Sequence, residues 1–427
     1  MNSADQFVKT HKLRAEDIDI DAIVSGFTRE MEKGLAGEEG SLRMIPTYIE
    51  ADNEFLKEVP VLAIDAGGTN FRAALVKFDK AGRPEPFEIV NRRMPGLDGE
   101  VSAGEFFGTM ADYVRPLAEK AERVGFCFSY PTEILPDRDG KLLYFSKELQ
   151  APEVIGRLVG KSLLQALGTP GKPVVLLNDT VATLLAGKSE SFGKSYSSFI
   201  GFILGTGTNT CYIESNAAIK KSPGLDGTKS QIINIESGNF SRAPRTSLDL
   251  GFDNTTGNPG NYTLEKMFSG GYFGPLCLHV LKEAAGEGVF SPEASERLAK
   301  VEKLSSEDAG LFAAGKPGNN NVLSGCITDP EDAAACSAII DTLVDRAAKL
   351  VAANLAAVVL KCGKGQSPDE PVMMTIEGST FYKLHNLKQR FEGYFSDYLT
   401  GERKRYVEFT EVANSSLLGA ALAGLIE

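Results

Sequence analysis

Histidine and paired cysteine are scarce in this sequence of 427 residues. Its three histidines, His11, His279 and His385, lie away from any cluster of cysteines or carboxylates. A zinc centre and a Ser-His-Asp triad both require such clusters, so neither kind of site is supported. The six cysteines form no Cys-x-x-Cys pair, and several lie in apolar runs, which is typical of buried thiols in a reducing compartment.

An excess of basic residues is also missing. The formal net charge of -12 at pH 7 argues against a nucleic acid or an anionic membrane as partner. No run reaches the ~18 apolar residues of a membrane span, and the first thirty residues contain no apolar signal-peptide core. We therefore expect a cytoplasmic protein that binds any negative ligand locally, through backbone N–H groups and a few placed cations.

Hydrophobic residues and α/β patterning, by contrast, are plentiful. Hydrophobic residues make up 42% of a chain that is longer than one core usually holds, which favours two domains. Strand-like apolar runs alternate with helical patterns from Val59 to about residue 190. The patterns predict helices at 17–34, 154–167, 262–270, after 273 and at 334–362, strands at 125–128 and 174–177, and a loop at 251–260.

The most informative stretch is 61–78, where an apolar strand ends in Asp65 and a Gly-Gly-Thr turn leads into a second apolar strand. Two successive glycines let backbone N–H groups approach phosphate oxygens, and Thr69 adds a hydroxyl donor. Asp65 stands where a hydrated Mg²⁺ would bridge the phosphates, and Arg72 adds a cation. The alternative is an ordinary tight hairpin.

A second strand-turn-strand unit with Gly-Thr-Gly-Thr occupies 198–214. Two such units suggest a duplicated fold that grips a nucleotide from two sides, as in the sugar-kinase, actin and Hsp70 group. Two unrelated hairpins are the alternative. The second turn is no dinucleotide fingerprint, because Thr210 stands at the third glycine position and no helical pattern follows.

The chemical centre is predicted at 176–180, LLNDT, where a buried strand ends in Asn-Asp. A carboxylate at the carboxyl end of a parallel strand lies at the crevice where α/β proteins bind ligands. Asp179 is therefore the candidate general base, which would accept a proton from a substrate hydroxyl during phosphoryl transfer. The alternative is a helix N-cap for 181–187, and both roles are compatible.

At this point a family resemblance emerges. The sequence resembles the hexokinase family, the ATP-dependent hexose 6-kinases, from the first helix nearly to the last residue. The segments that carry the resemblance, in order, are REMEKGLAGEEGSLRMIPTYI (29–49), DAGGTNFR (65–72), FSYP (128–131), LLNDTVATL (176–184), GTGTNTCYIE (205–214), NIESG (234–238), PGNYTLEKMFSGGYFG (259–274), GSTFYKLH (378–385) and SSLLGAALAG (415–424).

The resemblance implies a two-domain α/β fold, the actin-like ATPase (ribonuclease H-like) fold, with a duplicated core around a central cleft. A small domain would hold 59–178 plus 414–427, and a large domain 1–58 plus 179–413. Sugar binding would close the cleft, excluding water and aligning the hydroxyl with the γ-phosphate. The implied reaction is phosphorylation of the 6-hydroxyl of a hexose by ATP with Mg²⁺, entering glycolysis, with glucose as the first candidate and mannose or fructose as alternatives.

The resemblance also assigns roles to individual residues. Asp179, Lys147 and Arg72 would be catalytic. The hexose would be bound by Ser129, Pro131, Ser146, Lys147, Asn178, Asp179, Asn209, Glu236 and Glu265. The nucleotide would be bound by Asp65, Ala66, Gly67, Gly68, Thr69, Asn70, Arg72, Gly205, Thr206, Gly207, Gly378, Ser379, Thr380, Ser415 and Ser416, with Asp65 reaching Mg²⁺ through water and no residue ligating the metal directly. Taken singly, each polar residue also fits a plain role, such as a solvated helix charge for Glu265 or a surface lysine for Lys147.

Several positions depart from the family pattern and leave the preferred hexose open. Ser146-Lys147-Glu148-Leu149 replaces Thr-Lys-Gly-Phe, Ser237 replaces a tryptophan, Tyr130 replaces Phe, and Asn261 replaces Gln. One changed contact shifts preference by ~1 to 3 kcal/mol. Two other interpretations remain: a hexose sensor that has lost phosphoryl transfer, and an actin-like or Hsp70-like ATPase without a sugar substrate.

Overall fold

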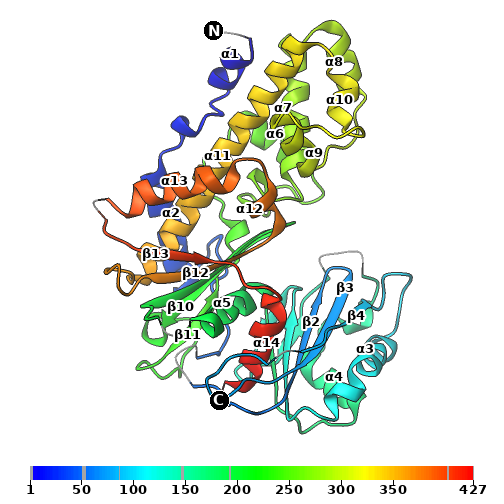
Figure 1. Cartoon of the computed structure of the whole chain (residues 1–427), viewed down its shortest axis with the longest axis vertical. Coiled ribbons are helices and arrows are strands. Elements are labelled where there is room, and N and C mark those ends of the chain that lie inside the picture. Colours follow the sequence, from blue (N-terminus) through cyan, green and yellow to red (C-terminus); the bar gives the residue numbers. More distant parts are fainter. Residues whose placement is uncertain are drawn as a thin grey trace.

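Two β-sheets form the centre of the protein, and most helices gather beyond the second sheet (Figure 1). This computed structural model describes residues 3–50, 54–85, 87–145, 149–191, 194–401 and 403–426. The predicted two-domain α/β class is confirmed. The division of the chain at residues 178 and 414 stays a prediction.

The first sheet has five strands in the order β4-β3-β2-β5-β8. Its strands are β2 (Val61–Gly67), β3 (Asn70–Val76), β4 (Val90–Arg93), β5 (Arg123–Phe128) and β8 (Val174–Leu177). The helices α3 (Ala103–Ala118) and α4 (Val159–Leu167) share a core with it. A small hairpin of β6 (Thr132–Ile134) and β7 (Gly140–Leu142) follows β5. We call these elements the first lobe.

The second sheet repeats this plan and adds one edge strand. Its order is β1-β11-β10-β9-β12-β13. Its strands are β1 (Ile45–Pro46), β9 (Ser198–Leu204), β10 (Thr208–Ser215), β11 (Ser230–Asn234), β12 (Val372–Glu377) and β13 (Val407–Thr410). In each sheet three consecutive antiparallel strands precede two parallel ones, so the predicted duplication of the core is confirmed.

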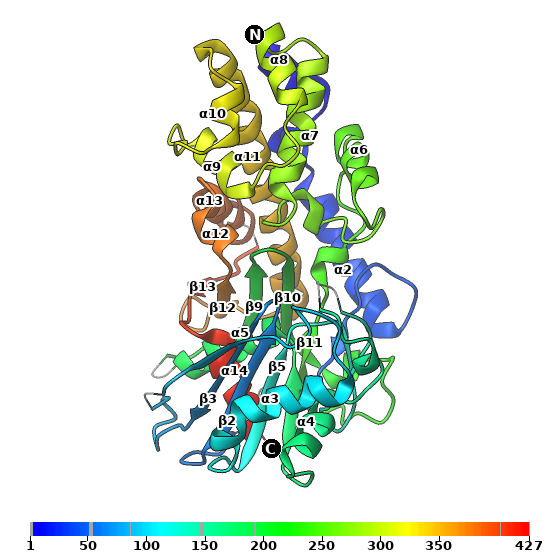
Figure 2. The ribbon, with the colours of Figure 1, turned by 90° about the vertical axis from the view of Figure 1, so that its right-hand side faces the viewer.

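The connection between β11 and β12 is much longer than the corresponding one in the first sheet, and it holds a group of helices seen in the upper half of Figure 2. These helices are α6 (Ser247–Thr255), α7 (Phe273–Gly286), α8 (Pro292–Ala299), α9 (Ser306–Ala313), α10 (Val322–Cys326) and α11 (Pro330–Cys362). We call the second sheet and the helices that share its core the second lobe. Its remaining helices are α1 (Ser3–Thr10), α2 (Ile20–Ala36), α12 (Ser379–Lys383) and α13 (Leu387–Leu399). Single 3-10 turns are η1 (Ala15–Asp17), η2 (Pro152–Val154), η3 (Asn216–Ala218), η4 (Ser237–Asn239) and η5 (Glu265–Met267).

The long helix α11 carries its own start and stop signals. Asp329 accepts hydrogen bonds from the backbone N–H groups of Glu331 and Asp332, and Pro330 occupies the first turn. Gly363 ends the helix in the left-handed conformation. Its buried face forms the main core of the second lobe together with α1, α2 and α13.

Two equivalent helices join the lobes: α5 (Asp179–Glu190) follows β8, and α14 (Ser415–Leu425) follows β13. Both lie between the sheets and share one buried core with strands of each (Figure 1). Their close approach requires glycine, because a Cβ at Gly419 would collide with the Ala182 carbonyl and one at Gly125 with the Ala420 carbonyl. The two halves of the duplication therefore meet along these helices.

Three predicted elements were partly wrong. The predicted helix 262–270 is only the turn η5, because the N–H groups of Gly270 and Gly271 bond to the turn after β9. The predicted loop 251–260 begins as the last part of α6, which a Thr246–Asp249 capping box starts. The predicted helix 154–167 is η2 and α4, separated by residues that leave the helical conformation.

Candidate active site

The carboxyl ends of β2, β5 and β8 bring the first set of predicted residues together. Asp65 pairs with Cys127 across the sheet, and Cys127 pairs with Leu177. The residues that follow these positions, Ser129 and Asn178 among them, therefore reach the same edge. The Ser129 N–H donates to the Ala66 carbonyl at 3.1 Å, which joins the predicted sugar loop to the predicted phosphate loop.

Asp65 and Arg72 form a tight pair at this edge. The Asp65 side chain is mostly buried, and its Oδ2 accepts from Arg72 Nε at 2.9 Å and Nη2 at 2.5 Å. Arg72 Nη2 also donates to Ser416 Oγ at 3.3 Å. The pair thus connects the phosphate loop with the start of α14.

The Gly-Gly-Thr turn between β2 and β3 is fixed by hydrogen bonds from two neighbouring segments. Gly68 adopts a φ of +61°, which glycine tolerates without strain. Tyr130 Oη donates to the Gly68 carbonyl at 2.8 Å, and the Met94 N–H donates to the Thr69 carbonyl at 3.0 Å. Burial and the charge of Asp65 raise the pKa of Tyr130, so its phenol remains a proton donor.

Asn178 and Asp179 stand at the start of α5. Asn178 is the N-cap, with its Oδ1 accepting from the Thr180 N–H at 2.9 Å, so the capping role predicted for Asp179 belongs to the preceding residue. Asp179 is the first helical residue and also accepts from the Thr180 N–H, at 2.8 Å. The predicted helix start at 181 was therefore two residues late, because the cap lies at Asn178.

Asp179 lies at the junction of the two sheets. Cys211 Sγ of β10 donates to the Thr180 carbonyl at 3.1 Å, which fixes the first turn of α5 against the second sheet. The pKa of Cys127 in β5 and that of Cys211 in β10 are both raised, first by burial and then partly by the charge of Asp179. One carboxylate is therefore close to a strand of each lobe.

The second glycine turn, between β9 and β10, is fixed by two other segments. Its Gly205 carbonyl accepts from the Gly270 N–H at 2.8 Å and from Thr380 Oγ1 at 2.9 Å. The Gly271 N–H donates to the Thr206 carbonyl at 2.8 Å. Gly378 has a φ of +119° and packs against the Leu204 carbonyl, where a side chain would collide. The predicted nucleotide residues 205–207 and 378–380 thus meet.

Glu236 is held by two amides next to the second turn. Its Oε1 accepts from Asn234 Nδ2 at 2.9 Å and from Asn209 Nδ2 at 3.2 Å. Burial raises the pKa of Glu236. The residue adopts a φ of +60°, an uncommon conformation for a glutamate that often marks functional sites. Both bonds fall on one oxygen, which leaves the carboxylate able to accept from a sugar hydroxyl.

Glu265 faces the same turn from η5. Its Oε2 accepts from the Thr208 N–H at 2.8 Å, at the point where β10 begins. A Cβ at Gly207 would lie 2.8 Å from this oxygen, so the glycine is needed for the approach. Glu236 and Glu265 therefore flank the start of β10, as a hexose site of carboxylates and amides requires.

The start of α14 was predicted to line the adenosine, and the structure gives its hydroxyls partners within the protein. Ser415 is buried and donates to Glu377 Oε2, which also accepts from Thr183 Oγ1 at 3.2 Å. Ser416 Oγ accepts a hydrogen bond from Arg72 Nη2. A nucleotide role for these two serines stays a prediction.

Several residues that shape the site were not found from the sequence. Asn234 and Glu377 end β11 and β12, where the only available signal was a polar residue after an apolar strand. Tyr144 carries no local signal, and Lys266 was quoted only as part of the segment 259–274 without a role of its own. Their roles depend on partners far away in the chain.

The predicted Ser146, Lys147 and Glu148 lie outside the described residues. Their neighbours do lie at the site. The ring of Phe145 packs against Tyr130, with 5.2 Å between ring centroids, and Leu149 is buried.

The carboxylate near the first glycine turn fits a hydrated Mg²⁺ ion held together with ATP. Across the described ranges no three or more His, Cys, Asp or Glu residues form a group suited to hold a metal. Mg²⁺ in kinases keeps several waters and is bound by one or two carboxylates together with substrate phosphates. Asp65, with Oδ2 engaged by Arg72 and next to the glycine turn that follows β2, fits contact with such an ion through water.

Comparison with known proteins identifies the family. Family models described as hexokinase match residues 3–189 and 199–426. The chain belongs to the hexokinase family. As a hexokinase it is an enzyme, a kinase that transfers a phosphoryl group from ATP to a hexose.

Individual relatives agree with this assignment. Human hexokinase-3 is 30% identical over 85% of this chain, which spans 41% of the human protein. The glucokinase of Aspergillus niger is 28% identical over 94% of this chain and 92% of its own length. The structure of Schistosoma mansoni hexokinase complexed with glucose has a TM-score of 0.78 at 24% identity, covering 99% of this chain and 98% of that one, which shows the shared fold. In the described part of the hexokinase no helix is long and apolar enough to cross a membrane.

Proposed function

We propose that this hexokinase transfers the γ-phosphoryl group of MgATP to the 6-hydroxyl of glucose, with Asp179 as the general base. The position of Asp179 carries the proposal. The carboxylate stands at the first turn of α5, which is bonded to β10 through Cys211 and follows directly from β8. A carboxylate beside a strand of each sheet supports a role between the proposed phosphate turns and the proposed sugar residues.

Asp179 would orient the 6-hydroxyl and accept its proton as the oxygen bonds to phosphorus. Phosphoryl transfer requires little covalent chemistry from the protein, so placing the hydroxyl and the phosphate is the main task. Asn178 supports this task because its cap bond to Thr180 fixes the first turn of the helix. Lys147 is proposed to donate to the sugar from the segment beside Tyr130.

The glycine turns at 67–69 and 205–207 are proposed to bind the phosphates. Backbone N–H groups would contact phosphate oxygens, and Arg72 would supply positive charge. Mg²⁺, when bound, neutralises charge on the β- and γ-phosphates, and Asp65 would hold its waters. The segment 378–380 would face the nucleoside, because it lies against the second turn.

Glu236, Glu265 and Asn209 are proposed to bind the ring hydroxyls of the hexose. A pyranose hydroxyl both donates and accepts, so carboxylates paired with amides satisfy it. The similarity to the Aspergillus niger glucokinase supports glucose as the first candidate. A cytoplasmic location and a preference for glucose over mannose or fructose stay predictions.

The deciding experiment is a coupled assay of ADP release from MgATP with a panel of hexoses and a control without sugar. Sugar-dependent release ranked highest for glucose supports the proposal. Equal release with and without sugar would indicate an ATPase module instead. If calorimetry detects hexose binding while no ADP appears, the protein is a sensor.

A further inference from the structure

Tyr262 has an unusual backbone conformation at the hexose site. Its φ is +52°, in the left-handed region that bulky side chains rarely adopt. Such residues persist where the surroundings hold them, and they cluster at functional sites. Tyr262 follows α6 and precedes Glu265 by three positions in the chain. The residue therefore presents a large phenol from a loop, outside any helix or strand.

The phenol meets a second tyrosine from the other lobe. Tyr262 Oη lies 3.1 Å from Tyr144 Oη, and Tyr144 follows β7 of the first lobe. Tyr144 is 44% exposed, so core packing does not account for its position. The hydrogen bond therefore connects the two lobes beside the segment that carries Ser146 and Lys147.

Tyr262 lies three residues before Glu265, which begins the turn η5. The pKa of Tyr262 is raised by burial, by the bond to Tyr144 and then by the charges of Glu236 and Glu265. The phenol therefore keeps its proton at physiological pH. Ionised carboxylates only accept hydrogen bonds, whereas two hydroxyls that share one bond keep a further proton to donate. Tyr262 thus adds a donor beside the two carboxylates.

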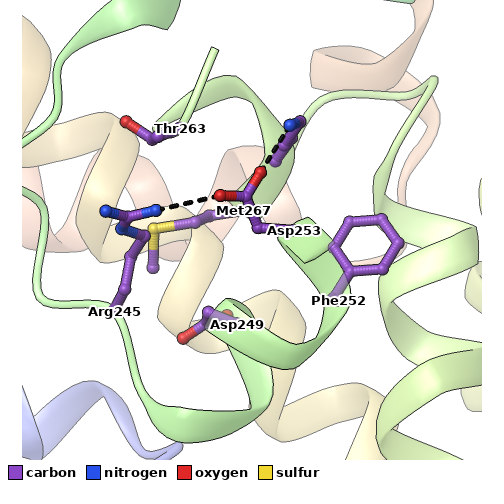
Figure 3. A pocket seen from close by; sticks show the side chains of 7 residues that line it. Arg245, Asp249, Phe252, Asp253, Thr263 and Met267 are labelled. Atoms are coloured by element: carbon purple, nitrogen blue, oxygen red, sulfur yellow. Dashed lines mark hydrogen bonds and ion pairs between the residues drawn. The ribbon is translucent and has the colours of Figure 1, made fainter. Parts of the chain in front are cut away.

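A buried ion network fixes the loop that carries Tyr262. Lys266 Nζ donates to Asp253 Oδ1 at 2.5 Å, to Thr256 Oγ1 at 2.8 Å and to the Asn258 carbonyl at 2.7 Å. Asp253 Oδ2 accepts from the Gly260 N–H at 2.9 Å. Figure 3 shows Arg245 pointing at Asp253 in the same pocket. The ammonium uses all three of its protons, so both the start and the end of the loop are tied down.

We propose that Tyr262 is a specificity-determining residue for the hexose and that Tyr144 positions it from the opposite lobe. The Tyr262 hydroxyl donates to one ring hydroxyl of the sugar, whose own proton goes to Glu236 or Glu265. A sugar lacking that hydroxyl leaves the phenol and a carboxylate without a partner and is discriminated against. The inference rests on the proposed function.

The test combines Tyr262→Phe with a panel of deoxy sugars. The variant keeps the ring and removes only the hydroxyl, so we expect kcat/KM for glucose to fall about threefold to tenfold, mainly through KM. The wild type and Tyr262→Phe are then compared on 1-deoxy-, 2-deoxy-, 3-deoxy- and 4-deoxyglucose. The two enzymes should have equal kcat/KM on the one analogue that lacks the hydroxyl contacted by Tyr262. That analogue identifies the hydroxyl.

Tyr144→Phe and the double variant test the positioning role. If Tyr144 acts through Tyr262, Tyr144→Phe reproduces part of the loss, and the double variant is no worse than Tyr262→Phe. Tyr113→Phe is the matched control, because Tyr113 lies on α3 and packs on Phe71 in the core of the first lobe, so all constants should stay unchanged. An equal loss on every analogue, or no loss on glucose, would overturn the inference. Absence of sugar-dependent ADP release in the wild type would instead overturn the proposed function.

Discussion

At the residue scale, Asp179 is the side chain on which turnover depends most. We predict that Asp179→Ala lowers kcat by about 10²- to 10⁴-fold, the usual contribution of a general base. The affinity for hexose should change far less, because Glu236, Glu265 and Asn209 remain. Steady-state kinetics and calorimetry of glucose binding measure the two quantities separately.

The control for this prediction is Asn178→Ala, which removes the helix cap and keeps the carboxylate. It should destabilise the protein by about 1 kcal/mol with a smaller loss in kcat. If Asp179→Ala binds glucose normally and turns over at the wild-type rate, Asp179 is not the base.

Glu236 should impose a pH dependence on hexose binding. Burial raises its pKa, so the carboxyl group takes up a proton at a higher pH than an ordinary glutamate. The carboxylate accepts from the sugar only when ionised, so affinity is present above the raised pKa and is lost as the pH falls through it. A pH series of the KM for glucose should rise on the acid side. In Glu236→Gln the KM should be high throughout, and this acid-side rise should disappear.

At the element scale, the turn η5 depends on the buried Lys266–Asp253 pair. Both side chains are almost fully buried, and after removal of Lys266 the Asp253 carboxylate keeps only Arg245, at 3.3 Å, as its cation. We predict that Lys266→Met destabilises the protein by about 3 kcal/mol in urea unfolding, the lower end of the range for breaking a buried ion pair. It should also raise the KM for hexose more than it lowers kcat, because the loop presents Tyr262 and Glu265.

Lys266→Arg separates the two effects, because it keeps the charge while changing the geometry of the donors. We expect it to recover stability better than KM. A Lys266→Met protein with wild-type stability would show that the network does not hold the loop.

Helices and turns were predicted unequally well from the sequence at this scale. The helix predicted at 334–362 ends where α11 ends and starts four residues after Pro330, where α11 begins. The helix predicted at 262–270 was wrong, because the N–H groups of Gly270 and Gly271 donate to the carbonyls of Gly205 and Thr206. The pattern of neighbouring residues predicts an element correctly when the backbone hydrogen bonds of that element are local. The prediction fails where a distant segment accepts those hydrogen bonds.

At the scale of the whole molecule, the contact of α5 with α14 joins the two halves of the fold. A Cβ at Gly419 would collide with the backbone of Ala182. We predict that Gly419→Ala destabilises the protein by about 1 to 3 kcal/mol, as overpacking does. Because α5 carries Asp179, kcat should fall as well. Thermal unfolding and steady-state kinetics measure both effects.

Gly108→Ala provides the matched control for this prediction. Gly108 lies within α3, and nothing lies within 4 Å of a Cβ added there. Alanine should stabilise this helix by up to about 1 kcal/mol. If both variants behave alike, close packing of α5 on α14 is not what links the lobes.

The sequence by itself determined the α/β class, both glycine turns and the Asn-Asp pair that begins α5. These features are readable because glycine conformations, strand alternation and helix caps act within a few residues. The tertiary structure alone decided that Asn234 supports Glu236, that Glu377 binds Ser415, and that Tyr144 meets Tyr262. The physical reason is strand register and the approach of the two lobes, which bring together side chains that share no local signal.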